Sequence, residues 1–449
     1  MLKKTKMGIG IYNTVFFELS VFIYIIYLYS LSSANIDDLL YAIVHGCFSV
    51  YIIIKTWKKI LHYYAENDFP LILITLLMFA IYYELSCVKY FTSPPYFYFV
   101  QDNLYRFLFS IFTGFLILGS VELMPWLAYK NTKAIKTPMK YKISKTWLMI
   151  CIILLIYTTY AKYSNNYISP YLQPTIELTM YDQIILFAND FLYIILSVLA
   201  VAQFEKKSFI SKIPIFFLMG ITLAESSLSG SRYIFFHEML ILFFLFLLFR
   251  KINLIKFTKL LIILPGIIIL VSLLAFNVSG RYSGDNAAIV DDLSYRFELS
   301  DYPLALIHNR DWGEFSLGTI QSGIIVAIPS IIIGEKNVND MTFSKDRILS
   351  QANLSTDVDY ADTYFSMGTE NFGIVGFITI LPFIIFLLNA LDIELSKMGP
   401  YSPFAKISFI QLFTTIELEW LDFFPEIRNG MLTMILLYVF YKLAIRSER

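Results

Sequence analysis

The sequence predicts an all-α polytopic membrane protein with about twelve transmembrane helices and one large extracytoplasmic loop. Only 16% of the 449 residues are charged and the mean hydropathy is +0.64, whereas soluble proteins average about 25% charged residues. Apolar runs of membrane-spanning length recur along the chain, and one polar stretch of more than ninety residues separates the ninth from the tenth. Together these observations predict a chain that crosses a lipid bilayer many times.

The twelve apolar runs are each long enough to cross roughly 30 Å of hydrocarbon. In chain order they cover residues 9–31, 38–56, 69–88, 104–127, 147–161, 184–204, 211–228, 233–250, 259–278, 372–389, 404–419 and 428–446. The first run has no small-residue cleavage site, so we expect it to stay in the protein as a helix. We therefore divide the chain into helices one to nine (1–278), a loop (279–371) and helices ten to twelve (372–449).

The distribution of basic residues predicts which ends of the helices face the cytoplasm. With the N-terminus inside, the inward segments hold 24 of the 35 Lys and Arg residues. The early outward segments hold only Lys89, Arg106 and Lys162. Because cytoplasmic loops of membrane proteins are enriched in Lys and Arg, we expect both termini to be cytoplasmic.

The large loop is acidic, aromatic and irregular, and a connection of this length is usually functional or disordered. Its aromatic residues and short amphipathic stretches favour folded helices on or within the outer leaflet. The apolar stretch 316–333 contains Gly318, Gln321, Gly323 and Pro329. Counting it as a span would place the C-terminal basic residues outside, so we interpret it as re-entrant or interfacial.

Four arginines on the expected outer side, Arg232, Arg281, Arg296 and Arg428, are candidate anion ligands. Guanidinium groups bind phosphate oxygens bidentately and stay charged at cellular pH, so the set suits a pyrophosphate group. Each has a structural alternative. Arg232 could reach lipid headgroups, the loop arginines could pair with a nearby Asp, and the acidic neighbours of Arg428 would suit a salt bridge.

The candidate bases are Asp359, Asp362 and Glu370, which precede or begin the tenth helix. A carboxylate near arginines at a membrane surface can accept a proton from a sugar hydroxyl. The glycine-rich stretch 368–376 would let a bulky lipid-linked substrate approach the backbone. The alternative is that the acids cap the helix and the glycines are helix contacts. His308 is a further candidate base.

Acids inside the apolar runs favour a different class of protein, because intramembrane carboxylates often mark proton paths. Glu18, Glu122, Asp190 and Glu225 would form the core of a transporter. From the sequence none of them pairs with a Lys or Arg inside the membrane.

The three cysteines stand singly and have no spacing to His that would suit a metal.

With these residues laid out, the chain resembles the Wzy-type polymerases of O-antigen and other oligosaccharide repeat units, especially the branch of the enterobacterial common antigen polymerase. The resemblance covers residues 220–430. It is carried by Gly-Ser-Arg at 230–232, Arg-Tyr-x-Gly at 281–284, Arg296 with its acidic-aromatic stretch, AIPSIIIG at 327–334, GTENFGIVG at 368–376 and Arg428. The His-rich signature of the related O-antigen ligases is missing, which favours a polymerase.

The resemblance implies a GT-C-like membrane glycosyltransferase in the bacterial inner membrane, with its active site facing the periplasm. Its donor and acceptor would both be glycans linked to undecaprenyl pyrophosphate. The four arginines would neutralise the departing pyrophosphate, and one acid among Asp359, Asp362 and Glu370 would deprotonate the acceptor hydroxyl. The resemblance implies no cofactor or metal and no nucleic acid, and it implies a chain-length regulator of the Wzz type as a partner. A lipid-linked oligosaccharide flippase, another transporter or an O-antigen ligase remain alternatives.

Overall fold

The computed structural model confirms an all-α protein over the part of the chain that it describes. The described residues are 26, 29, 35–65, 71–91, 103–127, 140–164, 180–204, 208–229, 232–249, 299–309, 318–328, 363–415 and 420–448. Within them lie thirteen α-helices, three short 3-10 helices and one two-stranded sheet. Of the expected runs, 9–31 is described only at residues 26 and 29, and 259–278 lies outside the described residues.

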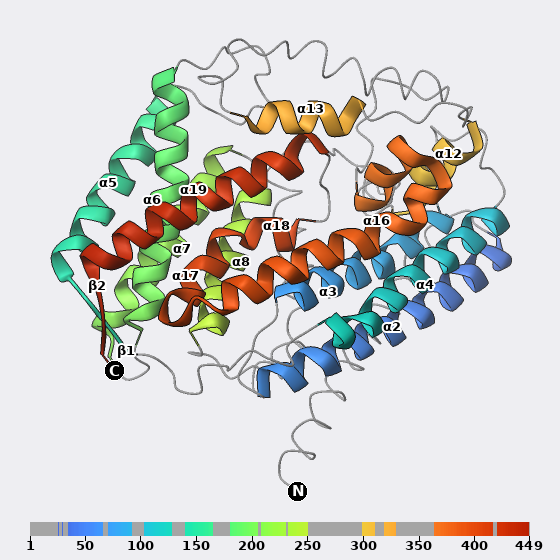
Figure 1. Ribbon diagram of the computed structural model, residues 1–449, viewed down its shortest axis with the longest axis horizontal. Coiled ribbons are helices and arrows are strands. Elements are labelled where there is room, and N and C mark those ends of the chain that lie inside the picture. Colours follow the sequence, from blue (N-terminus) through green and yellow to red (C-terminus); the bar gives the residue numbers. More distant parts are fainter. Residues whose placement is uncertain are drawn as a thin grey trace, which may run out of the picture.

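The helices follow the apolar runs closely at the start of the chain (Figure 1). The first seven described are α2 (Ile36–Ala65), α3 (Leu71–Leu85, continued by the 3-10 helix η1, Ser86–Phe91), α4 (Asn103–Leu127), α5 (Lys145–Ser164), α6 (Met180–Ala202), α7 (Ile213–Ser229, after the 3-10 helix η2, Ile210–Lys212) and α8 (Arg232–Leu248). Two short helices, α12 (Asp301–Asn309) and α13 (Gly318–Ala327), come from the expected loop. The last four are α16 (Tyr364–Ser396), α17 (Ser402–Ser408, after the 3-10 helix η4, Gly399–Tyr401), α18 (Ile410–Thr414) and α19 (Trp420–Ala444).

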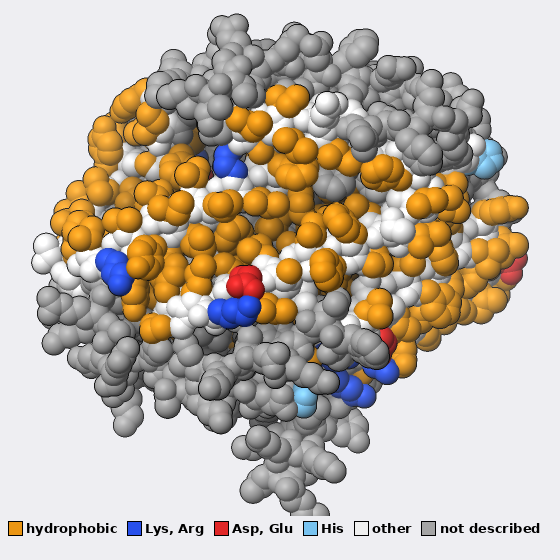
Figure 2. Space-filling view, viewed as in Figure 1, with side chains coloured by type: hydrophobic (Ala, Val, Ile, Leu, Met, Phe, Trp, Pro, Cys, Tyr) orange, Lys and Arg blue, Asp and Glu red, His pale blue; other side chains and the backbone are white. Residues whose placement is uncertain are grey.

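Within the described residues, five helical segments are long and apolar enough to cross a membrane. They are Ile36–Tyr63, Leu71–Phe91, Asn103–Leu123, Ile184–Ala202 and Tyr364–Ser396. Hydrophobic side chains also cover most of the described surface on the face seen in Figure 2, and only a few charged side chains are visible there. Soluble monomers rarely expose such a continuous apolar surface, so these features describe a multi-pass membrane protein.

Most of the long helices that the structure describes fall into two groups. In one group α2, α3 and α4 pack on one another, and α16 lies against α3 and α4. In the other α5, α6, α7 and α8 pack together, and α17 connects α8 to α16 and α19. Of the α3 side chains, ten of fifteen are buried, as expected for a helix that is apolar on all sides.

The apolar run 404–419 is divided in the structure, where the sequence predicted one span. Helix α17 ends at Ser408, and α18 ends at Thr414 after only five residues. A helix can end inside the protein when other groups satisfy its last carbonyls. Here the Thr75 hydroxyl donates to the carbonyl of Phe413 at 2.7 Å, and the Tyr364 hydroxyl donates to the carbonyl of Leu412 at 3.3 Å.

Helix α16 begins at Tyr364, eight residues before the expected start, and it is sharply kinked at Gly373. The backbone of Gly373 has φ +62° and ψ −143°, a conformation that only glycine adopts readily. The kink folds the first arm back on the second, so that Gly368 and Gly376 face each other with their backbones in contact. In this structure these two glycines of the 368–376 stretch are helix contacts.

The two ends of the molecule are marked by the small sheet and by the helices of the expected loop. At one end, which we call the sheet end, β1 (Lys140–Ile143) pairs antiparallel with β2 (Ile445–Glu448). Both segments were assigned to the cytoplasmic side from their basic residues. At the other end, which we call the loop end, lie α12 and α13 (Figure 1).

Candidate functional site

Two of the seven predicted site residues have described side chains. Glu370 lies in the first arm of α16 and is buried, and Arg428 lies in α19 and is partly buried. Arg232 is the first residue of α8, although its side chain is outside the described part. The remaining four predicted residues, Arg281, Arg296, Asp359 and Asp362, lie outside the described residues.

A tyrosine from the loop holds the Glu370 carboxylate. The hydroxyl of Tyr302, in α12, donates a hydrogen bond of 3.0 Å to Oε1 of Glu370. Both side chains are buried. A buried carboxylate in a helix of spanning length needs such a donor, because burying a polar group without a hydrogen bond is costly. Helix α12 therefore supplies part of the environment of Glu370.

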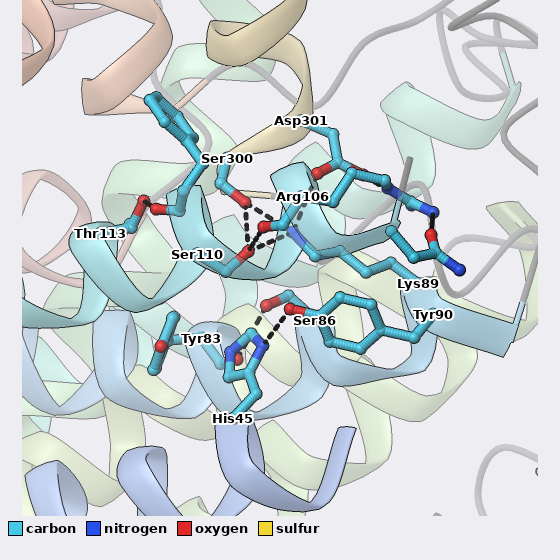
Figure 3. Close-up of polar contacts among 12 residues, drawn as sticks. His45, Tyr83, Ser86, Lys89, Tyr90, Arg106, Ser110, Thr113, Ser300 and Asp301 are labelled. Carbon is cyan, nitrogen blue, oxygen red and sulfur yellow. Dashed lines mark hydrogen bonds and ion pairs between the residues drawn. The ribbon is translucent and has the colours of Figure 1, made fainter. Parts of the chain in front are cut away.

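The residue before Tyr302 is the centre of a buried ionic cluster (Figure 3). Oδ1 of Asp301 lies 2.9 Å from the Lys89 ammonium, and Oδ2 lies 2.6 Å from Nη2 and 2.8 Å from Nε of Arg106. The Lys89 ammonium also donates to the hydroxyls of Ser110 and Ser300, each at 2.6 Å. We call these five residues the Asp301 cluster. It joins η1, α4 and the start of α12.

The Asp301 cluster brings two positive charges to one carboxylate. Burial raises the pKa of the Asp301 carboxyl, but the charges of Arg106 and Lys89 outweigh burial and hold the pKa below its ordinary value. The carboxylate is therefore ionised throughout the physiological range. Removing one partner of such a buried group leaves an uncompensated charge, which typically costs about 3–5 kcal/mol.

A buried histidine extends this polar region into α2. Nδ1 of His45 lies 3.1 Å from the Tyr90 hydroxyl, and the ring of His45 stands 4.1 Å from that of Tyr83. Figure 3 shows the two tyrosines on either side of the imidazole, below the Asp301 cluster. These contacts of His45 join α2, α3 and η1 next to the residues that bind α12.

Arg428 binds the end of α13. Its Nη1 donates to the carbonyls of Val326 and Ala327 at 3.3 Å each, and its Nε and Nη2 donate to the side chain of Asn429. A cation at a helix C-terminus satisfies carbonyls that have no partner in the helix and complements the helix dipole. Arg428 thereby fixes one end of α13 to α19.

The other end of α13 is fixed to α16, next to Glu370. The hydroxyl of Thr319 donates to the side chain of Asn371 at 2.8 Å, and Asn371 itself donates to the carbonyl of Met367. Helix α13 has ten residues, so it is too short to span a bilayer. The re-entrant or interfacial position of this segment stays a prediction. The contacts at its two ends place Glu370 and Arg428 near opposite ends of one short helix.

A second polar region lies among α5, α6, α7 and α8. The Lys162 ammonium is 3.8 Å from Oε2 of Glu225, and Nδ2 of Asn189 is 3.3 Å from Oε1. Deeper in the bundle, the hydroxyl of Thr222 donates to Glu238. The sequence showed no Lys or Arg inside the membrane as a partner for the embedded acids. In the structure two of these acids pair with lysines at or beyond the ends of the apolar runs: Glu225 with Lys162, and Glu122 with Lys55 and Lys59, each at 3.2 Å.

Sequence reasoning missed Lys89, Arg106, Asp301 and Tyr302 as site residues, although one signal was present. Lys89, Arg106 and Lys162 are the early basic residues that lie against the positive-inside bias. In the structure each of them pairs with a buried acid.

Among the residues that the structure describes, no group of three or more His, Cys, Asp or Glu side chains is arranged to hold a metal ion.

Comparisons of this chain with family models, with curated proteins and with solved structures find no match.

Proposed function

We propose that this chain is a membrane glycosyltransferase that polymerises oligosaccharide repeat units linked to undecaprenyl pyrophosphate on the outer face of the bacterial inner membrane. The proposal includes about twelve spans in a GT-C-like arrangement, cytoplasmic termini and a loop end that faces the periplasm. Its products are O-antigen or a related surface polysaccharide. A chain-length regulator of the Wzz type is the expected partner.

The observation that carries the proposal is the placement of Glu370 and Arg428 about one short helix at the loop end. Asn371, the neighbour of Glu370, binds the first turn of α13, and Arg428 binds its last carbonyls. Ten residues of helix span about 15 Å. A buried carboxylate and a guanidinium at this separation suit a substrate that carries a sugar hydroxyl at one point and a pyrophosphate at another.

In the proposed reaction the acceptor hydroxyl oxygen attacks the anomeric carbon of the donor glycan. The bond from that carbon to the pyrophosphate oxygen breaks, and its electron pair leaves with undecaprenyl pyrophosphate. Glu370 accepts the hydroxyl proton, while Arg428 stabilises the charge that develops on the leaving group. Arg232, Arg281 and Arg296 are proposed as further pyrophosphate ligands. Asp359 and Asp362 are the alternative bases.

A gel of surface glycan from complemented deletion strains tests the proposal. We expect the deletion strain to carry single repeat units, and wild-type protein to restore the ladder. Glu370→Gln and Arg232→Ala should reach normal levels in the membrane and still leave single units. Removal of a general base typically costs about 10²–10⁴-fold in rate, and Arg232→Ala removes a proposed ligand of the departing pyrophosphate. Glu122→Gln is the matched control and should restore the ladder, since its half-exposed carboxylate is bound by Lys55 and Lys59, which are not proposed site residues.

Two other outcomes contradict the proposal. A normal ladder in the deletion strain would exclude this chain as the polymerase. A complete absence of repeat units would point to a flippase or a ligase.

A transporter is the second candidate, and the observation in its favour is the buried Lys162–Glu225 pair between helices α5 and α7.

A further inference from the structure

We propose that Tyr302 is a positioning residue for Glu370, and that the Asp301 cluster holds α12 in place for this purpose. This inference rests on the proposed function, because it gives Tyr302 a part in preparing the base. Tyr302 comes from a segment of the expected loop, and Glu370 comes from a helix of spanning length. The two residues are 68 positions apart in sequence, so only the fold brings them together.

The first step of the argument is the hydrogen bond itself. The Tyr302 hydroxyl lies 3.0 Å from Oε1 of Glu370, and the two side chains are 1% and 5% exposed. A hydroxyl that donates to a carboxylate favours the charged form, which is the form that accepts a proton. It also fixes the orientation of the carboxylate, and orientation of a reacting group contributes strongly to rate. Tyr302 therefore acts on the acceptor through Glu370.

The second step is the anchoring of α12. Asp301 precedes Tyr302 directly, and its carboxylate is held by Lys89 and Arg106. Ser300 is bound by the same ammonium and lies 3.0 Å from the hydroxyl of Ser110. The start of α12 is thus bound to η1 and α4 by charged hydrogen bonds in the protein interior, where they are strong. A short loop helix held in this way can present one hydroxyl at a fixed position.

The third step is that the Tyr302 hydroxyl makes a specific contact with Glu370, in addition to the space that the tyrosine ring fills in the core. Tyr364, on the same helix as Glu370, is equally buried, but its hydroxyl donates to the backbone carbonyl of Leu412. A change of either tyrosine to phenylalanine removes one buried hydroxyl. Only Tyr302→Phe changes the surroundings of Glu370, which makes Tyr364→Phe a matched control.

The test that does not depend on turnover is the reactivity of Glu370 toward a hydrophobic carbodiimide. This reagent modifies protonated carboxyl groups in apolar surroundings, and peptide mass spectrometry locates the modified residue. We expect Tyr302→Phe in the full-length protein to raise the rate of Glu370 modification at pH 7 by about 3–10-fold, because one donor to the charged form is lost. Tyr364→Phe should leave this rate within twofold of wild type, as a rough bound on a change made elsewhere on the helix.

The second arm measures polymerisation of lipid-linked repeat units by the protein in vesicles. Tyr302→Phe should lower kcat about tenfold, and the KM for the acceptor should change less than about twofold, since the base and not the binding groups is affected. Both variants are first checked for a normal amount of folded protein. If activity falls only in proportion to folded protein and Glu370 labelling stays at the Tyr364→Phe rate, Tyr302 has no positioning role.

The two arms separate the failure of this inference from the failure of the proposed function. Wild-type protein without polymerase activity, together with a raised labelling rate in Tyr302→Phe, would contradict the proposed function alone. In that case Tyr302 still determines how readily the Glu370 carboxyl group is modified. Active wild-type protein with an unchanged labelling rate and unchanged kinetics in Tyr302→Phe would contradict the positioning role alone.

Discussion

At the scale of the residue, the basic side chains that lie against the positive-inside bias share one feature. Lys89 and Arg106 meet Asp301, and Lys162 meets Glu225. A charge inside a membrane protein is costly unless it has a partner, so a basic residue on the unfavoured side indicates a buried acid elsewhere in the chain. In this protein that acid is 212 residues from Lys89.

Asp301 gives a prediction about pH. Its folded pKa is lower than its ordinary value of about 3.9, so its ion pairs stabilise the fold fully above that value and lose their effect as pH falls through the folded pKa. We expect Asp301→Asn to lower the free energy of unfolding in detergent by about 3–5 kcal/mol at pH 7. The difference from wild type should stay constant between about pH 5 and 7 and shrink below about pH 4.

The control for Asp301 is Glu122, whose carboxylate also meets two lysines but is half exposed. Glu122→Gln should cost less than about 1 kcal/mol, as exposed ion pairs do. An equal loss of stability in the two variants would show that burial of the Asp301 cluster contributes nothing.

At the scale of the element, the kinked helix α16 depends on the absence of side chains where its two arms meet. A Cβ at position 376 would overlap the backbone of Gly368. We expect Gly376→Ala to destabilise the protein by about 3 kcal/mol, because neither backbone can move away easily. Gly119→Ala in α4 has open space around its new Cβ and should stabilise by about 0.5–1 kcal/mol. Thermal and denaturant unfolding of the two variants measure the contrast, and similar stabilities would argue against the close contact.

Helix α13 depends on its two end contacts in the same way. Arg428→Gln removes a charged donor from the carbonyls of Val326 and Ala327. We expect the free energy of local opening of α13 to fall by about 1.5–3 kcal/mol, measured by hydrogen exchange of its amides. Exchange in α4, which contacts neither end of α13, should be unaffected. Lys397→Gln, which breaks an exposed pair with Glu394, is the control and should leave exchange in α13 unchanged.

At the scale of the whole molecule, the two ends of the bundle should lie on opposite sides of the membrane. His308 is exposed at the end of α12, and Lys397 is exposed at the end of α16. In a background without the native cysteines, a membrane-impermeant thiol reagent should label His308→Cys in intact spheroplasts. It should label Lys397→Cys only after the membrane is made permeable. Labelling of both sites in intact spheroplasts would contradict the expected alternation of the chain.

The sequence by itself determined the class of protein and the positions of most helices. Hydrophobicity is a property of each segment alone, so the runs that became α2 to α8, α16 and α19 were visible without any knowledge of their neighbours. The charge bias likewise predicted that the segments of β1 and β2 lie at one end, and they pair there. Among the candidate site residues, the sequence singled out Glu370 and Arg428 because a carboxylate and a guanidinium at a helix end are unusual in an apolar chain.

Only the tertiary structure decided which polar groups meet. The run 404–419 is divided into α17 and α18, and the carbonyl of Phe413 near the end of α18 accepts a hydrogen bond from Thr75, 338 residues earlier. Asp301, Tyr302 and Val326 bind Lys89, Glu370 and Arg428 respectively, and each of these pairs is 68 or more positions apart in segments that the sequence treats as independent. Hydrogen bonds and ion pairs are pairwise and short in range, so their pattern depends on distances that no local property of the chain contains.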